Sequence, residues 1–111
     1  MGRFAVIDTE TSWRDQVMSI GVVVARSDTF APVEAKYHIL PIPCQIGGMY
    51  ESTLFIETPV APILCTRQEA LADLRTWFAG YGVRSVFAYN ACFDRNHLPE
   101  LRDFQWFDIM R

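Results

Sequence analysis

The sequence predicts a single α/β domain, and three features support this fold class. Runs of β-forming residues occur toward both ends of the chain, one long segment has helical periodicity with start and stop signals, and 111 residues are enough for one domain but not two. Half of the residues are apolar, so burial can offset the entropy cost of folding. We therefore expect one globular domain over residues 1–111.

The first two strands are expected to form a hairpin. Residues 4–7 are a short apolar run, typical of a strand covered on both faces. Residues 17–25 form a second β-rich run with three consecutive valines at its centre. The polar residues 11–16 between them are few, which predicts a turn between antiparallel neighbours.

The third strand is expected over residues 33–39, where apolar and polar residues alternate. This pattern predicts an edge strand with one solvent-facing side, made of Glu34, Lys36 and His38. Residues 41–65 follow as one long irregular excursion, punctuated by proline and glycine.

The second half of the chain predicts two helices and two strands. Thr66 and Glu69 form a capping box, and the helix that they begin is expected to stop at Gly80 and Gly82. Residues 85–89 form a short buried run, after which Asn90 can cap a second helix that ends near Pro99. Residues 104–108 are a candidate last strand.

Charge and cysteine content exclude several classes of protein. The net charge is −3, which argues against binding a nucleic acid or an anionic membrane by bulk positive charge. No apolar stretch approaches the roughly 20 residues of a membrane-spanning helix, and no targeting segment is recognised. The three cysteines, Cys44, Cys65 and Cys92, lie far apart without metal-site spacing, which favours a reducing, cytoplasmic location.

Three acidic residues are candidates for a metal site. Asp8 and Glu10 stand two residues apart at the end of the first strand, so both side chains project to one face. Asp94 follows the second buried strand, one turn into the helix that Asn90 begins. Carboxylates held this close favour Mg²⁺ or Mn²⁺, with water completing the shell.

The segment with Asp8-Thr9-Glu10, the hairpin and capped helix after it, and the segment from Asn90 to Asp94 resemble the first two motifs of the DEDD-type, DnaQ-like 3′–5′ exonucleases. The resemblance covers nearly the whole chain. It implies a ribonuclease H-like fold, with a mixed five-stranded sheet whose first three strands are antiparallel, flanked by helices. It also implies stepwise hydrolysis of phosphodiester bonds from the 3′ end of a nucleic acid.

The same resemblance assigns roles to individual residues. Asp8, Glu10 and Asp94 correspond to three of the four metal-binding acids of the family, acting on two Mg²⁺ or Mn²⁺ ions. Asn90 corresponds to a residue that braces the second motif. The remaining candidates, expected near the terminal nucleotide of a single-stranded substrate, are Thr9, Thr11 and Ser12.

The family completes its site with a later helix that carries a general-base histidine and a fourth aspartate, and the sequence to Arg111 has no such segment. We therefore expect weak or no nuclease activity from the 111-residue chain, and self-association through uncovered apolar surface. His97, three residues after Asp94, is a candidate substitute base.

Two other functions compete with this interpretation. One is a degenerate, non-catalytic member of the same family that binds nucleic acid or a protein. The other is a phosphatase of the haloacid dehalogenase type, which also begins with a strand ending in two acids. That class needs aspartate where Glu10 stands and a helix where residues 22–24 predict a strand.

Overall fold

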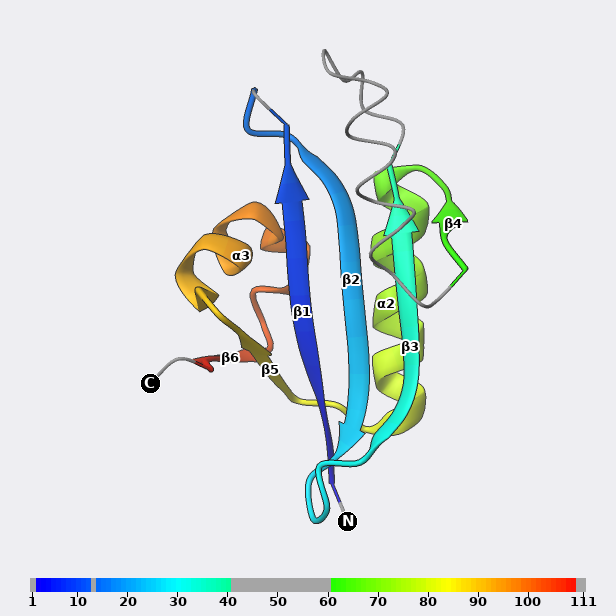
Figure 1. Cartoon of the computed structure of the whole chain (residues 1–111), viewed down its shortest axis with the longest axis vertical. Helices are drawn as coiled ribbons and strands as arrows, with labels where there is room; N and C mark the ends of the chain where they lie inside the picture. The colour runs from blue at the N-terminus through cyan, green and yellow to red at the C-terminus, as the bar shows by residue number, and fades with distance from the viewer. Residues whose placement is uncertain (1, 13, 41–60, 110–111) are drawn as a thin grey trace.

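The computed structural model describes residues 2–12, 14–40 and 61–109. These residues form an α/β protein with one mixed six-stranded sheet and two α-helices (Figure 1). The strands are β1 (Arg3–Thr11), β2 (Val17–Arg26), β3 (Pro32–Ile39), β4 (Ile63–Leu64), β5 (Ser85–Ala88) and β6 (Gln105–Asp108). The helices are α2 (Arg67–Tyr81), α3 (Ala91–His97) and the 3₁₀ turn η1 (Pro99–Leu101).

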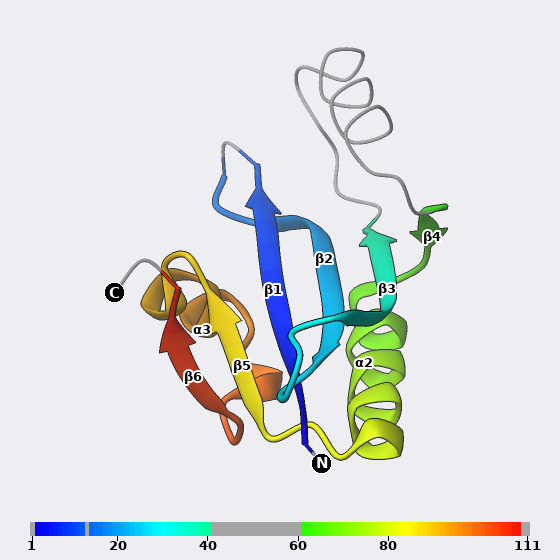
Figure 2. The same ribbon diagram turned by 60° about the horizontal axis from the view of Figure 1, so that its bottom comes forward.

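The strand order is β4-β3-β2-β1-β5-β6, which Figure 2 presents from one edge to the other. The β1–β2 and β2–β3 pairs are antiparallel, as predicted, and β1–β5, β5–β6 and β3–β4 are parallel. The expected number of five strands is wrong by one, because Ile63 and Leu64 add a short strand beside His38 and Ile39. A two-residue strand is too short for alternation to reveal it.

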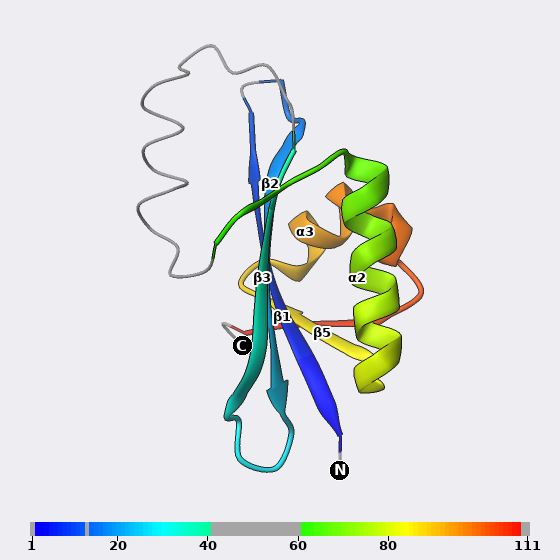
Figure 3. The ribbon, with the colours of Figure 1, turned by 90° about the vertical axis from the view of Figure 1, so that its right-hand side faces the viewer.

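Helices flank the sheet, as expected, and in the described part of the chain both of them pack on the same face (Figure 3). The core lies between this face and α2, where Ala5 and Ile7 of β1 meet Leu74 and Phe78. Helix α2 begins with the predicted capping box and ends at Gly82, whose φ of 71° is the left-handed conformation that glycine favours.

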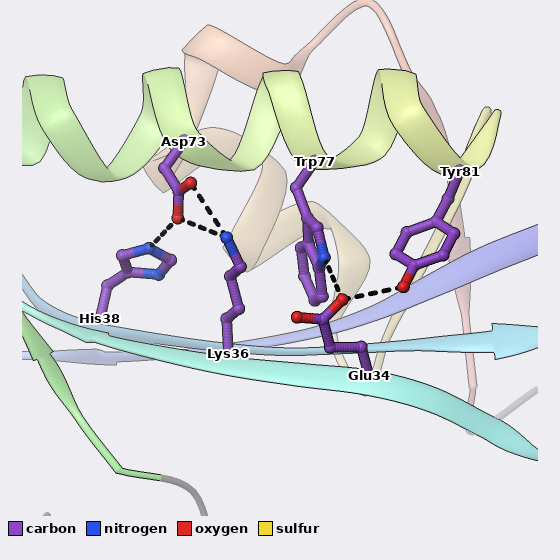
Figure 4. Close-up of polar contacts among 6 residues, drawn as sticks. All are labelled: Glu34, Lys36, His38, Asp73, Trp77 and Tyr81. Atoms are coloured by element: carbon purple, nitrogen blue, oxygen red, sulfur yellow. Dashed lines mark hydrogen bonds and ion pairs between the residues drawn. The ribbon is translucent and has the colours of Figure 1, made fainter.

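The polar side of β3 packs against α2, and only Glu34 of its three polar residues is exposed, which corrects the prediction that this side faces solvent. Lys36 Nζ lies 3.0 Å from both carboxylate oxygens of Asp73 on α2, and His38 Nε2 lies 2.8 Å from Oδ2 (Figure 4). His38 is fully buried. The polar residues of β3 therefore hold α2 against the sheet.

The same interface continues toward the end of α2. Glu34 Oε1 accepts hydrogen bonds from Trp77 Nε1 at 2.9 Å and from the Tyr81 hydroxyl at 2.8 Å (Figure 4). These two donors lower the pKa of Glu34. Alternation predicted correctly that these side chains share a face of β3, but α2 supplies the partners that make this face the covered one.

The other face of the sheet carries no helix within the described residues, and it has an aromatic patch. Four phenylalanine rings run across it in consecutive contact, with centroids 5.9 Å apart for Phe30–Phe4, 5.3 Å for Phe4–Phe87 and 5.1 Å for Phe87–Phe107. A pocket of about 750 Å³ is lined in part by Phe4, Phe30 and Phe87. Of the three aromatic residues expected to lack cover, Phe107 is 44% exposed, whereas Phe104 and Trp106 are partly buried against the core.

Candidate acidic site at the carboxyl end of the central strands

The candidate site lies where β1 extends beyond the end of its parallel neighbour β5. Strand β5 pairs with β1 only at Ala5 and Val6, and the chain then leaves the sheet to form α3. Among the described residues, the part of β1 beyond Val6 therefore has no strand partner on that side. The carboxyl end of parallel strands is a common position for ligands in α/β proteins.

Two side chains hold the start of helix α3 at this end of the sheet. Asn90 caps the helix, because its side-chain oxygen accepts a hydrogen bond of 3.2 Å from the Phe93 amide. Asp108, at the end of β6, accepts one of 2.7 Å from the Ala91 amide. Asn90 was a sequence candidate, and its bracing role agrees with this cap. Asp108 was missed, because nothing local to it indicates a contact seventeen residues away.

Asp94 is buried and turned toward β1. Its Oδ1 accepts two hydrogen bonds from Thr9, one of 3.1 Å from the amide and one of 2.5 Å from the hydroxyl. Burial raises the pKa of the Asp94 carboxyl, and the bonds from Thr9 offset only part of this rise. The contact joins the two segments that the sequence singled out, across 85 positions of the chain.

Asp8 lies beside this contact on the exposed side of β1. Loss of surrounding water raises the pKa of its carboxyl, and the negative charge of Asp94 raises it further. The two carboxylates are therefore close enough to repel each other. Glu10 is also exposed, and its cross-strand partner on β2 is Ser19, whose buried hydroxyl has no hydrogen-bond partner within residues 2–12, 14–40 and 61–109.

The structure brings the three predicted acids to one end of the sheet but does not place them in one coordination shell. Within residues 2–12, 14–40 and 61–109, no group of three or more histidine, cysteine, aspartate or glutamate residues could hold a metal ion. Strand alternation explains this. Thr9 holds Asp94 on the face covered by helices, whereas Asp8 and Glu10 project to the opposite face.

Two of the expected substrate contacts, Thr9 and Ser12, have structural roles of their own. Thr9 is buried against Asp94. The Ser12 hydroxyl accepts hydrogen bonds from the amides of Arg14 and Gln16, at 3.2 and 3.3 Å, and so orders the β1–β2 turn. Thr11 is the last residue of β1 and is half-buried.

His97 does not have the geometry of a general base. Its Nδ1 lies 2.8 Å from the Phe93 carbonyl oxygen and its Nε2 lies 2.7 Å from Asp15 Oδ1 in the β1–β2 turn. Both partners accept hydrogen bonds, so the doubly protonated ring satisfies them together. These contacts also raise the pKa of His97. The residue therefore ties the turn to α3.

Comparison with known proteins adds no assignment, because no family model matches the chain and no curated protein matches it. Among the described helices, none has the length and apolar character needed to cross a membrane. The site geometry and the two sequence motifs are therefore the basis for a functional assignment.

Proposed function

We propose that this chain is a ribonuclease H-like domain of the 3′–5′ exonuclease type, which hydrolyses phosphodiester bonds at the 3′ end of a nucleic acid with the help of Mg²⁺ or Mn²⁺. The fold is compatible with this proposal, because β1 lies between an antiparallel β2 and a parallel β5. The observation that supports it is the contact between the two motifs, in which the Thr9 amide and hydroxyl of the first motif donate hydrogen bonds to Asp94 of the second.

Carboxylates with water are the usual protein ligands of Mg²⁺, which also binds substrate phosphates. In this proposal Asp8, Glu10 and Asp94 would hold the cation, which requires the Asp94 carboxylate to turn from Thr9 toward the Asp8 side of β1, because the described residues do not gather the three acids into one group. The buried Ser19 hydroxyl, on the residue paired across the strands with Glu10, has no hydrogen-bond partner among the described residues. When bound, such a cation activates water and stabilises the departing 3′ oxygen.

The acidic residues would make substrate binding depend on the cation. Two carboxylates that already repel each other also repel a phosphodiester, and the net charge of −3 offers no compensating positive surface. Substrate binding should therefore depend on the cation as strongly as hydrolysis does. Thr11 and Ser12 lie at the turn that continues β1 past the acids, where a terminal nucleotide would meet their polar groups.

The test is the shortening of a 5′-labelled single-stranded oligonucleotide in Mn²⁺, with and without EDTA. Because the family's later histidine and fourth aspartate have no counterpart in these residues, we expect at most a weak ladder, which EDTA abolishes and Asp8→Asn reduces at least tenfold. The matched control is Asp28→Asn, which removes an exposed aspartate whose partner is Arg26 at the far end of β2. Shortening that survives EDTA, or that Asp8→Asn leaves unchanged, would contradict the proposal.

A non-catalytic role in binding nucleic acid is the second candidate. Two observations favour it: both ring nitrogens of His97 are engaged, and the three acids do not share one shell in the described residues. In that case Mn²⁺ should promote binding of the labelled oligonucleotide without shortening it. The same assay, followed by gel mobility shift, separates the two functions.

A further inference from the structure

Within the described residues, a single ion pair ties the β1–β2 turn to α3. His97, the last residue of α3, places its Nε2 2.7 Å from Oδ1 of Asp15, across 82 positions of the chain. The other hydrogen bonds of Ser12 and residues 14–16 in this part of the chain stay within the turn. A pocket of about 720 Å³ lies beside the contact and is lined by residues from both sides of it. The His97–Asp15 contact, more than close packing, therefore holds the turn beside α3.

The geometry of the His97 ring requires a proton on each nitrogen. Nδ1 lies 2.8 Å from the carbonyl oxygen of Phe93, and Nε2 faces the Asp15 carboxylate, so both neighbours are hydrogen-bond acceptors. A protonated imidazole donates to both of them, whereas a neutral one donates from a single nitrogen and turns a lone pair toward the other oxygen. The Phe93 carbonyl oxygen and, after it, the Asp15 carboxylate accordingly raise the pKa of His97.

Charged groups from three elements surround His97. Asp15 faces it from the turn, and Asp94 lies one helical turn earlier on α3, so both negative charges favour the protonated ring. Arg67 of α2 donates a hydrogen bond of 2.7 Å to the His97 carbonyl oxygen, but its guanidinium is paired with Glu100 at 2.7 Å. The ring also stands at the carboxyl end of α3, where the helix dipole favours a cation. These surroundings together favour the imidazolium.

The β2–β3 turn is held by a pair that does not titrate near neutral pH. Its Asp28 accepts two hydrogen bonds from Arg26, of 3.0 and 2.8 Å. A guanidinium stays protonated in proteins, and Arg26 lowers the pKa of Asp28 to about 2. Both members of this pair therefore stay charged from about pH 5 to 9. Of the two turns, only the β1–β2 turn is held by a group that titrates near pH 7.

We infer that His97 and Asp15 form a pH-sensitive switch, which holds the β1–β2 turn against α3 while the imidazole is protonated and releases it when the ring becomes neutral. The contact is complete below about pH 6.5, the ordinary pKa of histidine, and is lost as pH rises through the higher pKa of His97 in the folded protein. Because solvent screens the exposed Asp15 carboxylate, protonation should favour the closed turn by about two- to fivefold. This inference is independent of the proposed function, since it requires neither a cation nor a nucleic acid.

The test is an NMR titration of the full chain from pH 5 to pH 9. The His97 ring and the backbone amides of Asp15 and Gln16 should titrate with one midpoint, while the Asp28 amide stays in place. Nuclear Overhauser contacts between the His97 ring and Asp15 should be lost above that midpoint. Asp15→Asn removes the charge, tolerates the left-handed φ of 63°, and should lower the proton affinity of His97 about two- to fivefold. Asp28→Asn, the matched control, should leave this affinity unchanged.

Three results would overturn the inference. One is a set of Asp15 and Gln16 amides that do not follow the His97 ring in the unmodified chain. Another is a His97 midpoint that Asp15→Asn leaves unchanged. The third is a turn that titrates equally in His97→Gln, whose amide has no charge to lose, because a different group would then cause the change. Since the first result comes from the unmodified chain, the inference stays testable even if a variant does not fold.

Discussion

Replacing Asp8 by asparagine should stabilise the metal-free protein. The pKa of Asp8 is raised by loss of surrounding water and by the charge of Asp94. A carboxyl whose pKa is higher in the folded than in the unfolded state costs stability once it is ionised, and this cost grows as pH rises through the two values. Asparagine keeps the size of the side chain and removes the charge. The gain should therefore be present at pH 7 and vanish near pH 3.

The size of the gain follows from the exposure of Asp8. A pair of charges that solvent screens is worth about 0.5–1 kcal/mol. For a domain of this size each kcal/mol moves the melting temperature by about 4–8 °C, so the expected rise is about 2–8 °C. The assay is thermal unfolding in EDTA at low ionic strength. Adding 1 M salt should reduce the difference, since it shortens the screening length to about 3 Å.

With Mn²⁺ bound, the unmodified protein should be more stable than Asp8→Asn, the reverse of their order in EDTA. A cation at about 100 times its Kd stabilises the folded state by about 2.7 kcal/mol, and Asp8→Asn removes one of its ligands. The control is Asp28→Asn. Arg26 lowers the pKa of Asp28 to about 2, so this variant should lose stability in EDTA. If Asp8→Asn also loses stability in EDTA, the two acids do not repel each other and the reasoning is refuted.

Three further predictions concern the rest of the structure. Asp73→Ala removes the acceptor of the buried His38 ring and should cost about 1–2 kcal/mol in urea unfolding; an unchanged midpoint would contradict the role of this interface. His97 has a raised pKa, so its contact with Asp15 should stabilise the fold below about pH 6.5 and fade at higher pH. His97→Gln should accordingly lower the melting temperature at pH 5.5 and not at pH 9. Phe107→Ser should reduce self-association measured by light scattering at high concentration; equal masses for both proteins would argue against the open face as the contact.

Local signals predicted most of the elements. The capping box of Thr66 and Glu69 and the glycine at position 82 set both ends of α2, because each acts within one turn of helix. The β1–β2 hairpin followed from two β-rich runs separated by a short polar connection. These features depend on residues that are near each other in the sequence, so one sequence is enough to find them.

The predictions that were wrong concern features that depend on contacts between distant residues. Alternation in β3 predicted which side chains share a face but could not predict which face packs against another element. The partners of Glu34, Lys36 and His38 lie on α2, far away in the sequence. The same limit applies to the site. The sequence identified Asp8 and Asp94 as neighbours, but nothing in the spacing indicated that Thr9 holds Asp94 on the opposite side of β1.

The most direct test of the acidic site is the location of Mn²⁺ by anomalous scattering in crystals of the full chain grown with the cation. The account predicts one strong peak at the carboxyl end of β1, within coordination distance of the carboxylate oxygens of Asp8, Glu10 and Asp94. An anomalous peak at any other position, or none at the carboxyl end of β1, would contradict it.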